Sequence, residues 1–173
     1  MAHNDRVARL SSAWIEASGR FIARIESAGD AAAAASPAGG WNAAQIAWHV
    51  AVVNDRFAKI IGEGQGAALA GSEFVERGWR DVVAAMPPRR QAPPWAQPPD
   101  AVDPADALRR LRDSSEKLTA AIAALTPERG AMCIRADFTG SISATISVYQ
   151  AAEWATAHVV LHNRQAKRAL GEG

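Results

Sequence analysis

Residues 152–170 read AEWATAHVVLHNRQAKRAL, and this stretch decides the fold. It belongs to a predicted helix that begins at Ser143 or Ser147 and runs to about Leu170. Residues at three- and four-residue steps share one face of a helix, and we expect the following face to point inward. It consists of Val148, Ala151, Ala155, His158, His162, Ala166 and Ala169. Because alanine dominates this face, a neighbouring helix can approach it closely. We expect the outer face to carry Tyr149, Glu153, Arg164 and Lys167.

Three more amphipathic helices are predicted upstream of this stretch. The first spans about residues 4–28, and the alanine run 31–35 can extend it. The second spans residues 42–62, and the third spans residues 104–125. In each, apolar residues recur at helical spacing, which indicates one buried face per helix.

Two of these helices carry clear start signals. Asn42 is a good N-cap, and Gln45 follows three residues later, as in a capping box. Asp103 is a second N-cap, with Pro104 at the first helical position and Asp106 in the first turn. Both starts are therefore predicted to within a residue.

The connection between the second and third helices, residues 62–104, is rich in proline. It holds seven of the nine prolines, which exclude a continuous helix. A short helix is predicted over residues 72–85. We interpret the rest chiefly as a surface crossover; the alternative is a wall or lid over a cleft, with Trp79 and Trp95 as apolar contacts.

Four long helices joined by one long crossover predict an all-α four-helix bundle. A single domain covers residues 1–173 in this interpretation. Residues 132–142 are ambiguous, with Gly140 marking a turn, and we predict no strand pair. The order and handedness of the helices stay open.

The composition excludes several classes of partner. Hydrophobic residues make up 49% and charged residues 21%, with a net charge of +1 and no basic patch. We therefore expect neither nucleic acid nor a membrane as partner. The single cysteine, Cys133, excludes an internal disulfide, and the N-terminus lacks an apolar signal segment. We expect a cytoplasmic protein.

Three of the four histidines lie on predicted helices. His158 and His162 are four residues apart and project from the same face, and His49 flanks the apolar stripe of the second helix. Buried neutral imidazoles need partners, and a divalent metal ion accepts three nitrogen lone pairs at once. Three protein ligands leave a position open for water or substrate, as catalytic sites do.

The spacing alone leaves a second interpretation open. His-x-x-x-His is a weak signal, and histidines on an apolar face can be core residues with ordinary hydrogen bonds. A peptidase is a poor interpretation, because Val159, Val160 and Leu161 stand where a metallopeptidase needs a glutamate.

The motif GGWNAAQIAWHV, residues 39–50, and the closing segment 152–170 together resemble the DinB-like superfamily of bacterial metal-binding helical bundles. In the first motif a tryptophan precedes the capped helix and a histidine follows eight positions later. The proline-rich crossover and the turn FTG, residues 138–140, also sit where that family has them. The resemblance covers nearly the whole chain.

This resemblance implies an up-down-down-up bundle that holds a divalent metal ion, often zinc or nickel. The implied ligands are His49, His158 and His162, and a homodimer is the implied assembly. Characterised relatives include enzymes that use low-molecular-weight thiols such as mycothiol, bacillithiol or glutathione, among them S-transferases and a maleylpyruvate isomerase.

We therefore expect a metal-dependent thiol S-transferase, or a related hydrolase-like enzyme, that acts on a small molecule. A metal ion with three neutral ligands can bind a thiol and lower its pKa. The alternative is a non-catalytic metal-binding protein of stress response or interaction, and a third interpretation is a metal-free bundle.

Several residues near the histidines are weaker candidates. Gln165, one turn beyond His162, either orients a metal-binding histidine or is a surface residue at the end of the helix. Arg56 is either a contact for an anionic thiol or a solvated flank residue. Trp154 is either a pocket wall or core packing. Trp41 is expected to pack the start of the second helix, and no role is assigned to Cys133.

Overall fold

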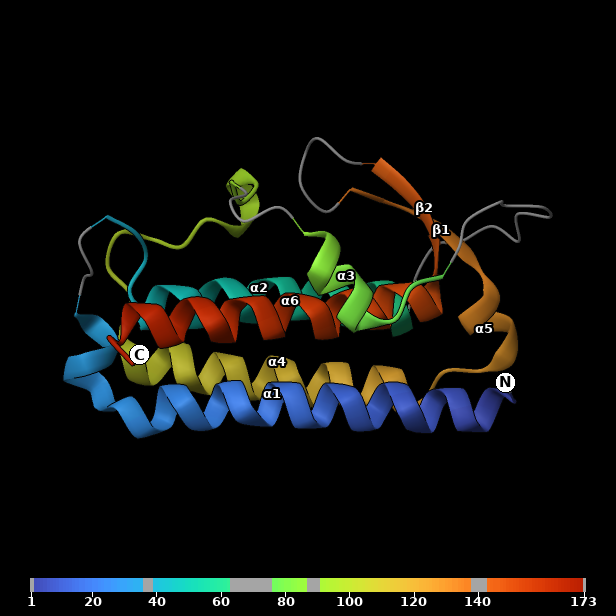
Figure 1. Ribbon diagram of the computed structural model, residues 1–173, viewed down its shortest axis with the longest axis horizontal. Helices are drawn as coiled ribbons and strands as arrows, with labels where there is room; N and C mark the ends of the chain where they lie inside the picture. The colour runs from blue at the N-terminus through green and yellow to red at the C-terminus, as the bar shows by residue number, and fades with distance from the viewer. Residues whose placement is uncertain (1, 36–38, 63–75, 87–90, 138–142, 173) are drawn as a thin grey trace.

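A computed structural model describes residues 2–35, 39–62, 76–86, 91–137 and 143–172. It is mostly helical, with one small two-stranded sheet (Figure 1). The long helices are α1 (His3–Ala34), α2 (Ala43–Gly62), α4 (Pro104–Ala123) and α6 (Val148–Ala169). The shorter elements are α3 (Trp79–Ala85), the 3₁₀ turn η1 (Pro94–Ala96), α5 (Pro127–Ala131), β1 (Cys133–Asp137) and β2 (Ser143–Ser147).

The four long helices pack around a common core. α1 contacts both α4 and α6, and α2 contacts the same two helices. Figure 1 shows α1 and α6 running one way along the bundle and α2 and α4 running the other. Side-chain pairs agree: Arg9 of α1 pairs with Glu153 of α6 at 2.5 Å. Further along both helices, Arg24 donates to Asn163 at 2.7 Å.

The predicted apolar faces form this core. On α1, Leu10, Trp14, Phe21 and Ile25 are almost fully buried. On the predicted alanine face of α6, Ala151, Ala155 and Ala166 are fully buried and Ala169 is partly buried, and α1 and α2 both contact this helix. Large apolar side chains of α1, α2 and α4 thus fill the space that small α6 side chains leave.

The predicted helix starts are confirmed. Asn42 Oδ1 accepts from Gln45 N–H at 2.8 Å, and Gln45 Oε1 accepts from Asn42 N–H at 3.1 Å. Asp103 accepts from Asp106 N–H at 2.8 Å. Ser147, one of the two predicted starts of the last helix, accepts from Gln150 N–H at 3.0 Å. These side chains satisfy amide groups that a first helical turn leaves unpaired.

The prediction that no strands pair is wrong. β1 and β2 form an antiparallel ladder in which Ile134 lies opposite Ile146. Both isoleucines are buried, and five residues per strand are too few for alternation to stand out in the sequence. Gly140 lies outside the described residues. Consequently Ser143 belongs to β2 and does not start the helix.

The predicted outer face of α6 also needs correction. Tyr149 is 6% exposed and Glu153 is 4% exposed. Tyr149 lies against α5 and the start of α1. Glu153 accepts from the backbone N–H of Trp79 at 2.9 Å. The predicted helix over 72–85 is confirmed for Trp79–Ala85 and is wrong for 76–78, which are not helical; residues 72–75 lie outside the described residues. The predicted outer face is therefore covered near its start, by α1 and α5 at Tyr149 and by α1 and the crossover at Glu153.

Among the described residues, no helix is both long and apolar enough to cross a membrane.

Gly130 of α5 allows Tyr149 to pack, and we predict that Gly130→Ala destabilises the fold. An added Cβ would lie 2.1 Å from Tyr149 Cζ, and His3 Nδ1 holds the Tyr149 hydroxyl at 2.7 Å, so the ring cannot move freely. We expect a loss of about 1–3 kcal/mol in the free energy of unfolding, measured by urea denaturation.

The matched control is Gly19→Ala within α1, where a Cβ meets no atom within 4 Å. There the higher helix propensity of alanine should raise stability by up to about 1 kcal/mol. Equal effects of the two substitutions would contradict the packing argument.

Candidate metal centre

Two helices bring three histidines together inside the bundle. His49 lies near the start of α2, and His158 and His162 lie one turn apart on α6. Their ring centroids are 5.2 Å apart for His49 and His158, 4.6 Å for His49 and His162, and 4.3 Å for the α6 pair. The tight packing of α2 against the alanine face of α6 makes this approach possible.

Each ring offers a nitrogen to a common point, and these nitrogens lie within 4.8 Å of one another. The Nε2 atoms of His49 and His158 are 3.2 Å apart. Two nitrogens bound at about 2.0–2.1 Å to a tetrahedral zinc ion are about 3.3–3.4 Å apart. The group could therefore hold a metal ion after a small adjustment of the rings, and imidazole suits zinc, nickel, copper and iron.

The backbone carbonyl of Ala96 orients the first of these rings. His49 Nδ1 lies 2.7 Å from Ala96 O. A carbonyl only accepts, so Nδ1 carries the hydrogen and Nε2 of the neutral ring keeps its lone pair. Metal-binding histidines commonly have such an oxygen partner on the second nitrogen.

Gln165 orients the second ring. Its Oε1 accepts from His162 Nδ1 at 2.8 Å, which again leaves Nε2 free to bind. Of the two interpretations of Gln165, the ligand-orienting one matches this contact.

The third ring lacks such a partner. His158 Nδ1 is buried, and no described residue offers it a hydrogen bond. Since His49 Nε2 is an acceptor, His158 Nε2 donates to it in the metal-free protein, and the lone pair on His158 Nδ1 stays unpaired. Among the described residues, one ring nitrogen of the three histidines thus lacks a hydrogen-bond partner, which is uncommon for a buried polar atom.

The family comparison identifies the family of the chain. Residues 13–166 match the family model of the DinB superfamily. The chain belongs to the DinB superfamily. Searches of the curated proteins and of the solved structures find no match.

Burial keeps the three imidazoles of this DinB-superfamily protein neutral. It lowers the pKa of His49 and lowers that of His158 far below its ordinary value, with the two neighbouring rings adding to the effect at His158. Desolvation, and to a lesser degree the charge of His49, lowers the pKa of His162 to about 3. His49 is buried, whereas His158 and His162 are partly buried. Near pH 7 all three rings are neutral, so each can offer one unprotonated nitrogen to a metal ion.

One tryptophan contacts a ring of the site. The ring of Trp41 lies 5.0 Å from that of His49, so Trp41 contacts the site as well as the start of α2. Trp154, one turn before His158, is partly buried against the hydrophobic core. Arg56 is exposed, and its guanidinium carbon lies 4.6 Å above the ring of Trp95.

The surface-crossover interpretation needs correction at residues 94–96. Ala96 is fully buried, and its carbonyl contacts His49, so this part of the crossover is a wall of the site. Sequence reasoning missed Ala96, because a backbone carbonyl carries no residue-type signal. The adjacent prolines, which fix a short turn, were the available hint.

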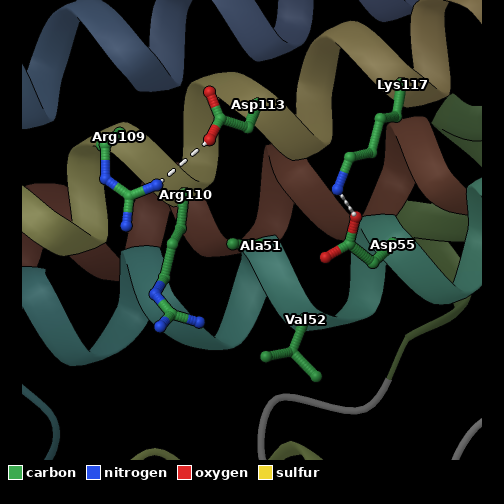
Figure 2. A pocket seen from close by; sticks show the side chains of 7 residues that line it. All are labelled: Ala51, Val52, Asp55, Arg109, Arg110, Asp113 and Lys117. Atoms are coloured by element: carbon green, nitrogen blue, oxygen red, sulfur yellow. Dashed lines mark hydrogen bonds and ion pairs between the residues drawn. The ribbon is translucent and has the colours of Figure 1, made fainter.

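A separate groove between α2 and α4 does not contribute to the site (Figure 2). Its lining includes Ala51, Val52, Asp55, Arg109, Arg110, Asp113 and Lys117. Lys117 pairs with Asp55 at 3.0 Å and Arg109 pairs with Asp113 at 3.3 Å, as Figure 2 shows. The charges compensate one another at an exposed surface, which is typical of a solvated helix face.

We predict that the metal-free protein becomes less stable as the pH falls from about 6.5 toward 3. The folded state resists protonation of His162 down to a pKa of about 3, whereas the unfolded chain takes up that proton near 6.5. The stabilisation is therefore complete above pH 6.5 and is lost below it. Urea denaturation of chelator-treated protein at pH 7.5 and at pH 5 measures how much the free energy of unfolding changes with pH.

The His162→Asn variant removes this titrating group and should show a shallower loss of stability over the same range. If the free energy of unfolding falls equally with pH in wild type and variant, the pH dependence does not come from His162.

Proposed function

We propose that this protein binds one divalent metal ion, zinc or nickel, through Nε2 of His49, His158 and His162. The observation that carries the proposal is the convergence of three neutral imidazoles whose ring nitrogens lie within 4.8 Å of one another. Two of them are already oriented by hydrogen bonds at Nδ1. Membership of the DinB superfamily supports the same ligand set.

The proposed activity is transfer of a low-molecular-weight thiol to a small electrophilic substrate. A divalent ion held by three neutral ligands supplies Lewis acidity that lowers the pKa of a coordinated thiol. In the transfer, the thiol proton leaves to solvent, a sulfur–carbon bond forms, and the leaving group of the electrophile departs with the electron pair. The thiol-dependent enzymes of the DinB-like superfamily, which this chain resembles, support this class of reaction.

The residues of the chain have distinct tasks in this proposal. The three imidazoles carry no charge near pH 7, so they leave the positive charge of the site undiminished. The partial accessibility of His158 and His162 supports an approach route for a small molecule. Trp41 beside His49 supplies an apolar surface that excludes water.

We also propose the up-down-down-up topology of the family and a homodimeric assembly. The topology is supported by the run of the helices in Figure 1 and by the Arg9–Glu153 and Arg24–Asn163 pairs. The homodimer is supported by the family resemblance and is measurable by sedimentation equilibrium.

Metal content of the untagged protein tests the site. We expect about one zinc or nickel ion per chain by elemental mass spectrometry, lost in His158→Ala because a two-histidine site binds too weakly to survive purification. The matched control is His3→Ala, a histidine that contacts Tyr149 outside the site and should leave the metal in place. Metal-free wild type that also takes up none on addition would overturn the proposal.

Thiol conjugation tests the activity. The metal-loaded protein should accelerate the reaction of glutathione, mycothiol or bacillithiol with 1-chloro-2,4-dinitrobenzene, followed by absorbance. Loss of one ligand should reduce the rate at least about 100-fold, since the site that activates the thiol is gone. A metal-loaded protein inactive with all three thiols would favour the non-catalytic alternative.

A further inference from the structure

The segment Pro93–Gln97, which we name the crossover turn, is a defined element and not a passive connection. Ala96 N–H donates to Pro93 O at 2.9 Å, and Gln97 N–H donates to Pro94 O at 3.3 Å. Two prolines at its start fix the backbone, and Ala96 is fully buried. The turn is thus held by its own hydrogen bonds and by packing.

Three side chains from α2 hold this part of the crossover. Gln45 donates from Nε2 to Pro99 O at 3.0 Å and to Asp100 O at 3.2 Å. His49 donates to Ala96 O. Arg56 stacks on Trp95, at 4.6 Å from the ring centroid. Steps of four and seven residues place these three side chains along one stripe of the helix.

The middle contact uses one of the proposed metal ligands. Binding of a metal through Nε2 of His49 requires the tautomer with the hydrogen on Nδ1. The Ala96 carbonyl requires the same tautomer, because it only accepts. The metal ion and the Ala96 carbonyl therefore both favour the tautomer of His49 that carries its hydrogen on Nδ1.

We infer that the crossover turn is a positioning element for the metal ligand His49, and that metal binding and docking of the turn stabilise each other. This inference rests on the proposed metal site. Its second half follows from thermodynamic reciprocity: if the docked turn raises metal affinity by some factor, the metal raises the docking equilibrium by the same factor. Partners of metal-binding histidines typically change metal affinity by about 10–100-fold.

The Trp95→Ala variant tests the first half. It removes the stacked partner of Arg56 and loosens the turn, while Trp95 itself is 41% exposed and contributes little to the core. We expect zinc affinity, measured by competition with a chromophoric chelator, to fall about tenfold.

The matched control is Trp79→Ala. Trp79 is also a crossover tryptophan with a stacked arginine, Arg80, at 4.5 Å from its ring, but it lies in α3, which contacts α6. Its loss should change zinc affinity by less than about twofold. The Arg56→Ala and Arg80→Ala variants remove the other partner of each stack. Arg56→Ala should lower zinc affinity, whereas Arg80→Ala should leave it unchanged.

Hydrogen exchange of the wild-type protein tests the second half without any substitution. Zinc should slow exchange of the Ala96 and Gln97 amides, read by mass spectrometry on peptides that cover residues 91–102. The Trp95→Ala variant should lose part of this zinc-dependent protection.

The outcomes separate this inference from the proposed function. Wild type that binds no zinc overturns the metal site and this inference with it. Wild type that binds zinc, with equal affinity in Trp95→Ala and Trp79→Ala and unchanged exchange at residues 91–102, overturns the positioning role alone.

Discussion

Three imidazoles lie in the interior of the helical bundle, and each has two ring nitrogens that need a hydrogen-bond partner or a metal ion. The surrounding residues supply some of these partners. One ring takes a backbone carbonyl from the crossover, and another takes a glutamine amide from its own helix. The third has a buried nitrogen with no partner among the described residues. Burial also keeps the rings neutral, which makes them donors for a metal ion and poor acceptors of protons.

The bundle provides the geometry that this arrangement needs. Alanines on the inward face of α6 let α2 approach, so that His49 Nε2 lies 3.2 Å from its counterpart on His158. Larger residues on that face would hold the helices apart by more than a ring can span. The opposite side of α6 is covered as well: Tyr149 lies against α1 and α5, and Glu153 accepts from the backbone N–H of Trp79.

In the described part of the crossover, the contacts with the bundle near α3 and at the crossover turn differ in chemistry. Near α3, Gln150 accepts from the backbone N–H of Arg77 at 2.6 Å and donates to its carbonyl at 2.8 Å, which fixes that residue as a strand neighbour would. At the crossover turn, the contact goes through His49, a candidate metal ligand. The first attachment is structural, whereas the second joins the connection between two helices to the chemistry of the site.

The sequence by itself determined the long helices, their caps and the three histidines. The apolar spacing and the caps depend on contacts within a few residues, so the sequence is enough to predict them. The caps are Asn42, Asp103 and Ser147. Only the tertiary structure decided that Tyr149 and Glu153 are buried, that β1 pairs with β2, and that Ala96 orients His49. Each of these depends on a segment distant in the chain, and the last depends on a backbone carbonyl that every residue type possesses.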